Sequence, residues 1–240
     1  MKYFWIIFLM VCFSFIQHQV SGQEDGNKSA RVAGKIVFEG ENIPKQGLLN
    51  TNEDIDYCGE TLPSERLLVD PGSKGIKNAV VALTPKSPLK NSNLSSESRV
   101  NALVNFHCRF APHLITLKKG EALYIKNGDP VLHSNHFYKG KKSLFNLAMI
   151  PGAAPTKKVI NEEGVIHVKC DIHDFMEGFI VVDPAPWVRV TGEDGVFDFG
   201  SIPAGNYQFS VWHETFDKLV SDLSFKPGEN RYLPLGVKPN

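Results

Sequence analysis

The stretch from Cys170 to Met176 constrains this chain more than any other part of its sequence. It places a thiol, an imidazole and a thioether, those of Cys170, His173 and Met176, within seven residues. Residues 166–170 alternate in polarity, so Cys170 shares the inward face of a predicted strand with apolar neighbours. Residues 179–182 then resume as an apolar strand. The pattern predicts a ligand-bearing loop between two strands at the rim of a β-sandwich.

A fourth candidate ligand, His133, lies upstream in a polar segment. Two histidines, one cysteine and a weakly bound methionine form the ligand set of a type 1, or blue, copper centre. Zinc would gain little from the methionine, since a structural zinc site uses four strong ligands. A binuclear copper centre needs a second cysteine near Cys170, and the sequence has none there. The sequence therefore predicts one copper ion per chain, held by His133, Cys170, His173 and Met176.

The spacing Cys-x-x-His-x-x-Met-x-Gly before an apolar strand resembles the copper loop of amicyanin-like members of the cupredoxin family. Residues 127–137 resemble the family's first-ligand segment, and on that match His133 is the ligand and His136 is not. The chain departs from the family at Ser134, where cupredoxins usually carry an asparagine that ties the two ligand loops together. Asn135 is a candidate to replace that link.

The resemblance implies a Greek-key β-sandwich over residues 100–183 that carries single electrons and is not an enzyme. It also implies that His173 lies near the surface as the electron port, and that the redox partner is a dehydrogenase or a cytochrome. The alternative is a copper-binding or structural module of a cell-envelope assembly, without an electron-transfer role. Lys139, Lys141 and Lys142 are interpreted as an ordinary solvated turn, with docking of an acidic partner as the alternative.

The N-terminal residues 1–22 have the features of a Sec signal peptide. Lys2 precedes a long apolar run, and a small-residue cleavage site precedes Gln23. An uncleaved N-terminal anchor is the alternative. We therefore expect a periplasmic or secreted protein with no transmembrane span after signal cleavage.

The cysteines follow from this expectation of export. Cys12 is lost with the signal peptide, which leaves Cys58, Cys108 and Cys170. Thiols tend to pair in an oxidising compartment. If a metal holds Cys170 as its thiolate, Cys58–Cys108 is the natural disulfide; otherwise any two of the three could pair.

The charge pattern bears on the kind of partner. Lysine plus arginine and aspartate plus glutamate number 26 each, so the formal net charge is zero. The sequence has no basic stripe with interleaved aromatic residues, which argues against nucleic acid as a partner.

His213 is interpreted as a hydrogen-bonded histidine on a C-terminal strand, with a second metal site or a partner contact as the alternative.

Many short strand patterns separated by glycine and proline turns, without a convincing amphipathic helix, predict an all-β fold. In residues 184–240, Asp-Gly and Pro-Ala-Gly turns separate alternating strands. This pattern resembles the carboxypeptidase regulatory-like family, a small transthyretin-type β-sandwich. The N-terminal β segment, residues 23–99, has loops over residues 41–75 and ends in a linker before residue 100. It would supply the missing strands from residues 31–85, with the copper domain inserted between. Three regions folded in sequence order are the alternative.

Overall fold

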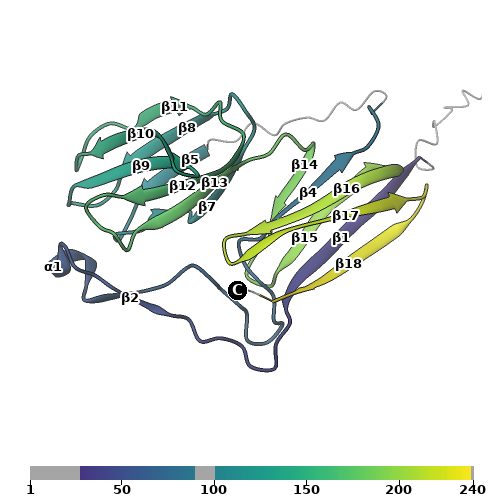
Figure 1. Cartoon of the computed structure of the whole chain (residues 1–240), viewed down its shortest axis with the longest axis horizontal. Coiled ribbons are helices and arrows are strands. Elements are labelled where there is room, and N and C mark those ends of the chain that lie inside the picture. Colours follow the sequence, from purple (N-terminus) through teal and green to yellow (C-terminus); the bar gives the residue numbers. More distant parts are fainter. Residues whose placement is uncertain (1–27, 90–100, 239–240) are drawn as a thin grey trace, which may run out of the picture.

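The computed structural model describes residues 28–89 and 101–238, and most of them form β-strands. Figure 1 shows two β-sandwiches side by side. The predicted all-β fold with two sandwiches is confirmed. The predicted signal peptide lies outside the described residues. Within the described part of the chain, no helix has the length and apolar character needed to cross a membrane.

The first sandwich consists of residues 101–182 and contains the predicted ligand loop. Its larger sheet has the order β10 (Lys142–Met149), β9 (His133–Lys139), β12 (Gly164–Cys170), β13 (Glu177–Val182) and β7 (Leu114–Leu117). Its smaller sheet has the order β11 (Thr156–Val159), β8 (Ala122–Asn127), β5 (Asn101–Asn105) and β6 (Phe110–Ala111). Because β12 pairs antiparallel with β9 and with β13, both predicted ligand segments belong to one sheet.

The second sandwich combines strands from both ends of the described chain. One sheet has the order β15 (Val196–Pro203), β1 (Ser29–Phe38) and β18 (Asn230–Val237). The other has the order β14 (Trp187–Val190), β4 (Val80–Pro85), β16 (Gly205–His213) and β17 (Phe216–Phe225). All strands of the first sandwich lie between β4 and β14 in sequence. Within the described residues, β1 pairs with β15 and β18 and not with a strand of the first sandwich.

Residues 41–75 form an arm that leaves the second sandwich and runs along the first (Figure 1). The arm contains a hairpin of β2 (Leu48–Asn50) and β3 (Thr61–Pro63), with the four-residue helix α1 (Ile55–Cys58) between them. The sequence predicted only loops here. The Cys58–Cys108 disulfide, the pair favoured from the sequence, joins α1 to the first sandwich.

Each sandwich has its own apolar core, and a smaller cluster joins the two. Val80 from the second sandwich packs with Leu114 and Val181 from the first. Near this junction the buried His113 Nε2 lies 2.5 Å from Glu214 Oε1. Burial alone would lower the pKa of His113, but the hydrogen bond and the charge of Glu214 raise it above its usual value. An apolar cluster and an ion pair therefore connect the two sandwiches.

Candidate metal centre

Strand alternation directs the side chains of β9 and β12 into the first sandwich. Along β9, His133, Asn135 and Phe137 are buried, and the residues between them are partly exposed. Cys170, the last residue of β12, pairs with Asn135 of β9 and is 3% exposed. The antiparallel register therefore brings the start of β9 next to the end of β12, with both side chains inside.

The loop after β12 returns the chain toward Cys170. The Met176 backbone N–H donates to the His173 carbonyl at 2.9 Å, and the Cys170 N–H donates to the Met176 carbonyl at 3.2 Å. Both His173 and Met176 are buried, at 0% and 1% exposure. The loop is therefore compact, and it turns the His173 ring over the Cys170 thiol.

Three candidate ligand atoms converge in this region. His133 Nδ1 lies 3.1 Å from His173 Nδ1, and Cys170 Sγ lies 3.9 Å and 3.5 Å from these two nitrogens. An ion bonded to nitrogen and sulfur at about 2.0–2.3 Å keeps its ligand atoms roughly 3.4–3.8 Å apart. The three observed distances, 3.1, 3.5 and 3.9 Å, lie in or within about 0.3 Å of this range, so small shifts of the side chains would let all three bind one metal ion. The three residues also form a potential metal-binding group by proximity.

The surroundings of Cys170 favour its thiolate. The backbone N–H groups of Ser134 and His173 donate to Sγ at 3.3 and 3.4 Å. Burial alone would raise the pKa of Cys170, but the hydrogen bonds with His133 and these amides lower it to about 6. Burial likewise opposes the charge on His133, yet Asp129 and Cys170 raise its pKa to about 9. Metal binding at this thiolate would displace the imidazole proton.

Asp129 accepts a hydrogen bond from the His133 ring nitrogen that faces away from Cys170. His133 Nε2–H donates to Asp129 Oδ2 at 2.9 Å, which leaves Nδ1 facing Cys170. The carboxylate also accepts hydrogen bonds from the backbone amides of His107 and Cys108 and from the Tyr57 hydroxyl. Burial alone would raise its pKa, but these donors lower it to about 2. Sequence reasoning gave Asp129 no role, and its only local signal is its position four residues before a candidate histidine ligand.

His173 is buried, but only one side chain separates it from the surface. Its side chain is 0% exposed, and its Nε2 lies 3.0 Å from Asp54 Oδ2 in the arm. The Asp54 side chain is 42% exposed and lies between the imidazole and solvent. Asp54 has no recognisable motif around it, and sequence reasoning did not single it out.

The structure places His136 on the outer face of β9. Its Nδ1 lies 2.9 Å from Asp171 Oδ2, and its Nε2 lies 2.7 Å from the Ser143 hydroxyl. The ring therefore points away from the buried site that His133 enters. This placement is consistent with the expectation that His136 is not a ligand.

Ser134 links the two candidate ligand segments despite its short side chain. Its carbonyl accepts the Asp171 N–H at 3.1 Å, and its hydroxyl lies 3.4 Å from Asp171 Oδ2. Asn135 makes a different connection, since its side-chain amide exchanges two hydrogen bonds with Asn105 of β5, at 3.0 and 2.9 Å. The loop-tying role therefore stays at Ser134, and Asn135 joins the two sheets.

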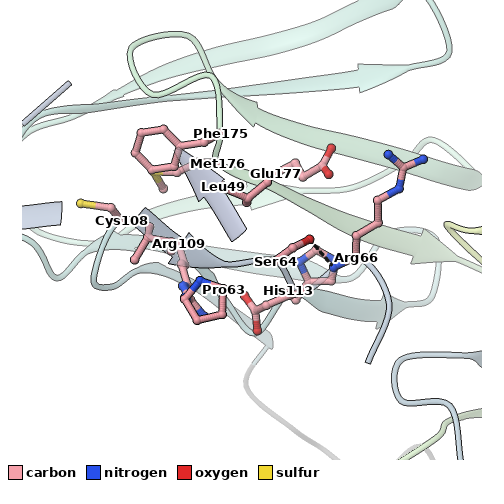
Figure 2. A pocket seen from close by; sticks show the side chains of 12 residues that line it. Leu49, Pro63, Ser64, Arg66, Cys108, Arg109, His113, Phe175, Met176 and Glu177 are labelled. Carbon is pink, nitrogen blue, oxygen red and sulfur yellow. Dashed lines mark hydrogen bonds between the residues drawn. The ribbon is translucent and has the colours of Figure 1, made fainter. Parts of the chain in front are cut away.

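Met176 lies where the arm packs on the first sandwich. Figure 2 shows its side chain beside Phe175 and Cys108, with Leu49 of the arm lining the same pocket. The cavity there has a volume of about 20 Å³, about the room that one water molecule needs. The arm is therefore closely packed against the loop that carries Met176.

The basic turn at residues 139–142 is remote from this site. His133 starts β9 and Lys139 ends it, and six residues of strand span about 20 Å. Lys139 Nζ lies 3.8 Å from Glu162 Oε2. These positions favour the interpretation of an ordinary solvated turn.

His213 is a buried histidine of the second sandwich whose ring nitrogens are hydrogen-bonded. Its Nδ1 accepts the Thr215 N–H at 3.2 Å, so Nε2 carries the proton and donates to the Lys77 carbonyl at 3.1 Å. Burial lowers the pKa of His213 to about 4. These contacts agree with the simpler of the two sequence interpretations.

Comparison with known proteins gives only partial structural similarity. No family model and no curated protein matches the chain. A purple cupredoxin from Nitrosopumilus maritimus is 22% identical over 35% of this chain and 99% of its own, with a TM-score of 0.31. Amicyanin from Paracoccus versutus is 22% identical over 42% of this chain and 98% of its own, with a TM-score of 0.32. A copper-containing nitrite reductase from Thermus scotoductus is 17% identical over 41% of this chain and 26% of its own, also with a TM-score of 0.32. The function proposed below therefore rests on the residues themselves.

Proposed function

We propose that this is an exported blue copper protein that carries single electrons. His133, Cys170 and His173 would hold one copper ion, with Met176 as a weaker axial ligand. The main support is the convergence of two imidazole Nδ1 atoms and one thiolate within 3.9 Å of one another in a buried site. Two nitrogens, a thiolate and a thioether match the preferences of copper in both oxidation states.

Copper bound here would supply a one-electron couple between Cu(II) and Cu(I). The protein's own contribution is to fix the donor atoms. Asp129 orients the His133 ring, and two backbone amides hold the Cys170 sulfur. Because the sheet and its loops set these positions, the donors need little movement when the charge of the site changes. Such rigidity suits rapid electron transfer.

The burial of the site supports a carrier over an enzyme. His133, Cys170 and His173 are each at most 3% exposed, so a substrate would have little access to the donor atoms. Electrons can pass through a closed protein shell, whereas bound substrates cannot. The partner we propose is a redox protein, a dehydrogenase or a cytochrome, by resemblance to amicyanin-like proteins.

We further propose that residues 100–183 form a domain inserted into the second sandwich. The support is the pairing of β1 and β4 with strands that follow the first sandwich in sequence. The carboxypeptidase regulatory-like character of the second sandwich stays a prediction from its turn pattern. Its role would be to attach the electron carrier to a larger assembly.

The decisive experiment is Cu(II) titration of the purified protein from Gln23 onward. We expect an intense visible band at one copper per chain, from charge transfer between the Cys170 thiolate and Cu(II). Cys170→Ser should abolish the band, and His133→Ala should weaken or abolish it. His136→Ala is the matched control and should retain it, since this ring faces outward. A colourless copper complex of the unaltered protein would refute the proposal.

Voltammetry separates electron transfer from simple copper binding. A carrier should show a reversible one-electron wave on the coloured protein. A coloured protein without a reversible wave would favour the alternative, a copper-binding module without an electron-transfer role.

A further inference from the structure

The arm, residues 41–75, makes a direct contact with the candidate metal centre. It extends to the centre from the second sandwich, and the Cys58–Cys108 disulfide links its helix α1 covalently to the first sandwich. Asp54 immediately precedes α1, and its Oδ2 lies 3.0 Å from His173 Nε2. Because a carboxylate only accepts hydrogen bonds, His173 Nε2 carries the proton of this contact, and its N–H donates to Asp54 Oδ2. Asp54 therefore holds the side of the ring that faces away from the site.

A second contact connects the arm to the other imidazole. The Tyr57 hydroxyl donates to Asp129 Oδ1 at 2.9 Å, and Asp129 Oδ2 accepts from His133 Nε2 at 2.9 Å. Tyr57 lies three residues after Asp54, on the same short helix. One helical turn of the arm thus supports both histidines, one directly and one through Asp129.

The backbone at Asp54 is specialised for this contact. Its φ of 49° and ψ of 39° lie in the left-handed region, which non-glycine residues seldom adopt and which aspartate and asparagine tolerate best. Its carbonyl accepts the N–H groups of Tyr57 and Cys58 at 2.9 and 2.8 Å, which fixes the turn. Unfavourable backbone geometry of this kind tends to occur where function requires it.

We propose that Asp54 is a positioning residue of the metal centre, which the arm supplies to His173. This inference rests on the proposed copper function. A carboxylate that accepts the remote N–H of a ligand imidazole fixes the ring orientation and makes the ring a stronger electron donor. Stronger donation stabilises Cu(II) more than Cu(I), so Asp54 lowers the reduction potential. Asp54 also lies between the His173 ring and solvent.

The test compares two changes at Asp54 with a matched control. Asp54→Asn keeps the side-chain shape and tolerates the left-handed backbone, and Asp54→Gly removes the side chain without backbone strain. Asp56→Asn removes the same charge from an exposed position on the same helix. We expect the Asp54 variants to weaken the preference for Cu(II) over Cu(I) about tenfold, which raises the potential by about 59 mV for one electron. Asp56→Asn should leave the potential close to that of the unaltered protein.

Two voltammetric outcomes would overturn the inference. Unchanged potentials in both Asp54 variants would show that the carboxylate does not act on His173. An equal shift in Asp56→Asn would show a general charge effect without positioning.

A measurement on the metal-free protein separates this inference from the copper assignment. Nitrogen-15 NMR of the imidazoles should show the proton of His173 on Nε2, with slow solvent exchange. Asp54→Gly should speed that exchange, and Asp56→Asn should not. If the unaltered protein forms no blue centre, the proposed function fails while this spectrum still tests the contact. If the blue centre forms and the exchange is the same in all variants, only the role of Asp54 fails.

Discussion

Removal of the Cys58–Cys108 disulfide should cost a large share of the protein's stability. The bond joins the arm to the first sandwich across a sequence separation of 50 residues, a loop that includes β4 of the second sandwich. The chain-entropy relation gives about 14 cal/mol/K for a loop of this length, or about 4 kcal/mol at 25 °C. Whole proteins are stable by about 5–15 kcal/mol. We therefore expect the paired Cys58→Ala and Cys108→Ala variant to unfold at a much lower denaturant concentration.

Two probes make the measurement specific. Trp187 and Trp212 both lie in the second sandwich, so their fluorescence reports its unfolding in metal-free samples. In copper-loaded samples, the visible band proposed above would report the first sandwich. The metal-free variant should lose about 4 kcal/mol in free energy of unfolding. The unaltered protein should lose the same amount when a non-chelating reductant opens its disulfide. A loss under about 1 kcal/mol in both samples would refute the loop-entropy reasoning.

Three further predictions concern single side chains. The folded protein holds the pKa of His213 at about 4, so as pH falls below 6.5 the unfolded chain takes up a proton there before the folded chain does. The free energy of unfolding should therefore drop by up to about 3 kcal/mol between pH 6.5 and 4. Denaturation curves at the two pH values should show a smaller drop for His213→Gln. Glu214→Gln removes the charge beside His113 but keeps an oxygen that can accept its N–H, so it should cost about 1–3 kcal/mol, with part of the loss recovered when His113→Gln is added, as a double-mutant cycle would measure. Met176→Leu should raise the reduction potential and Met176→Gln should lower it, and both variants should keep copper and colour. If voltammetry gives the unaltered protein and both variants the same potential, Met176 is not a ligand.

The local features of the candidate site could be predicted from the sequence. Alternating polarity before Cys170 indicated the strand, and the pattern after Gly178 indicated the next one, as β12 and β13 show. Strand patterns of this kind are local, because side chains two residues apart share one face. The same rule separates His133 from Ser134 and His136 along β9.

The contacts of the arm could not be predicted in the same way. Asp54 and His173 are 119 residues apart, and residues 41–75 have no periodicity that would place them against the first sandwich. The resemblance placed His173 near the surface, but nothing local indicated that Asp54 would cover it. The contact between Ser134 and Asp171 could not be predicted from the sequence either, because it forms only when the backbones of two distant segments pair.

The pairing of β4 with β14 has a consequence for how such a protein could arise. Leu83 near the end of β4 lies opposite Trp187 at the start of β14, so the chain enters and leaves the first sandwich at neighbouring points. Two adjacent antiparallel strands need only a turn of a few residues between them. The first sandwich thus occupies the place of a hairpin loop, and insertion at such exposed tips is tolerated. Exchange of residues 86–186 for a short turn would give a host sandwich into which other modules could be grafted.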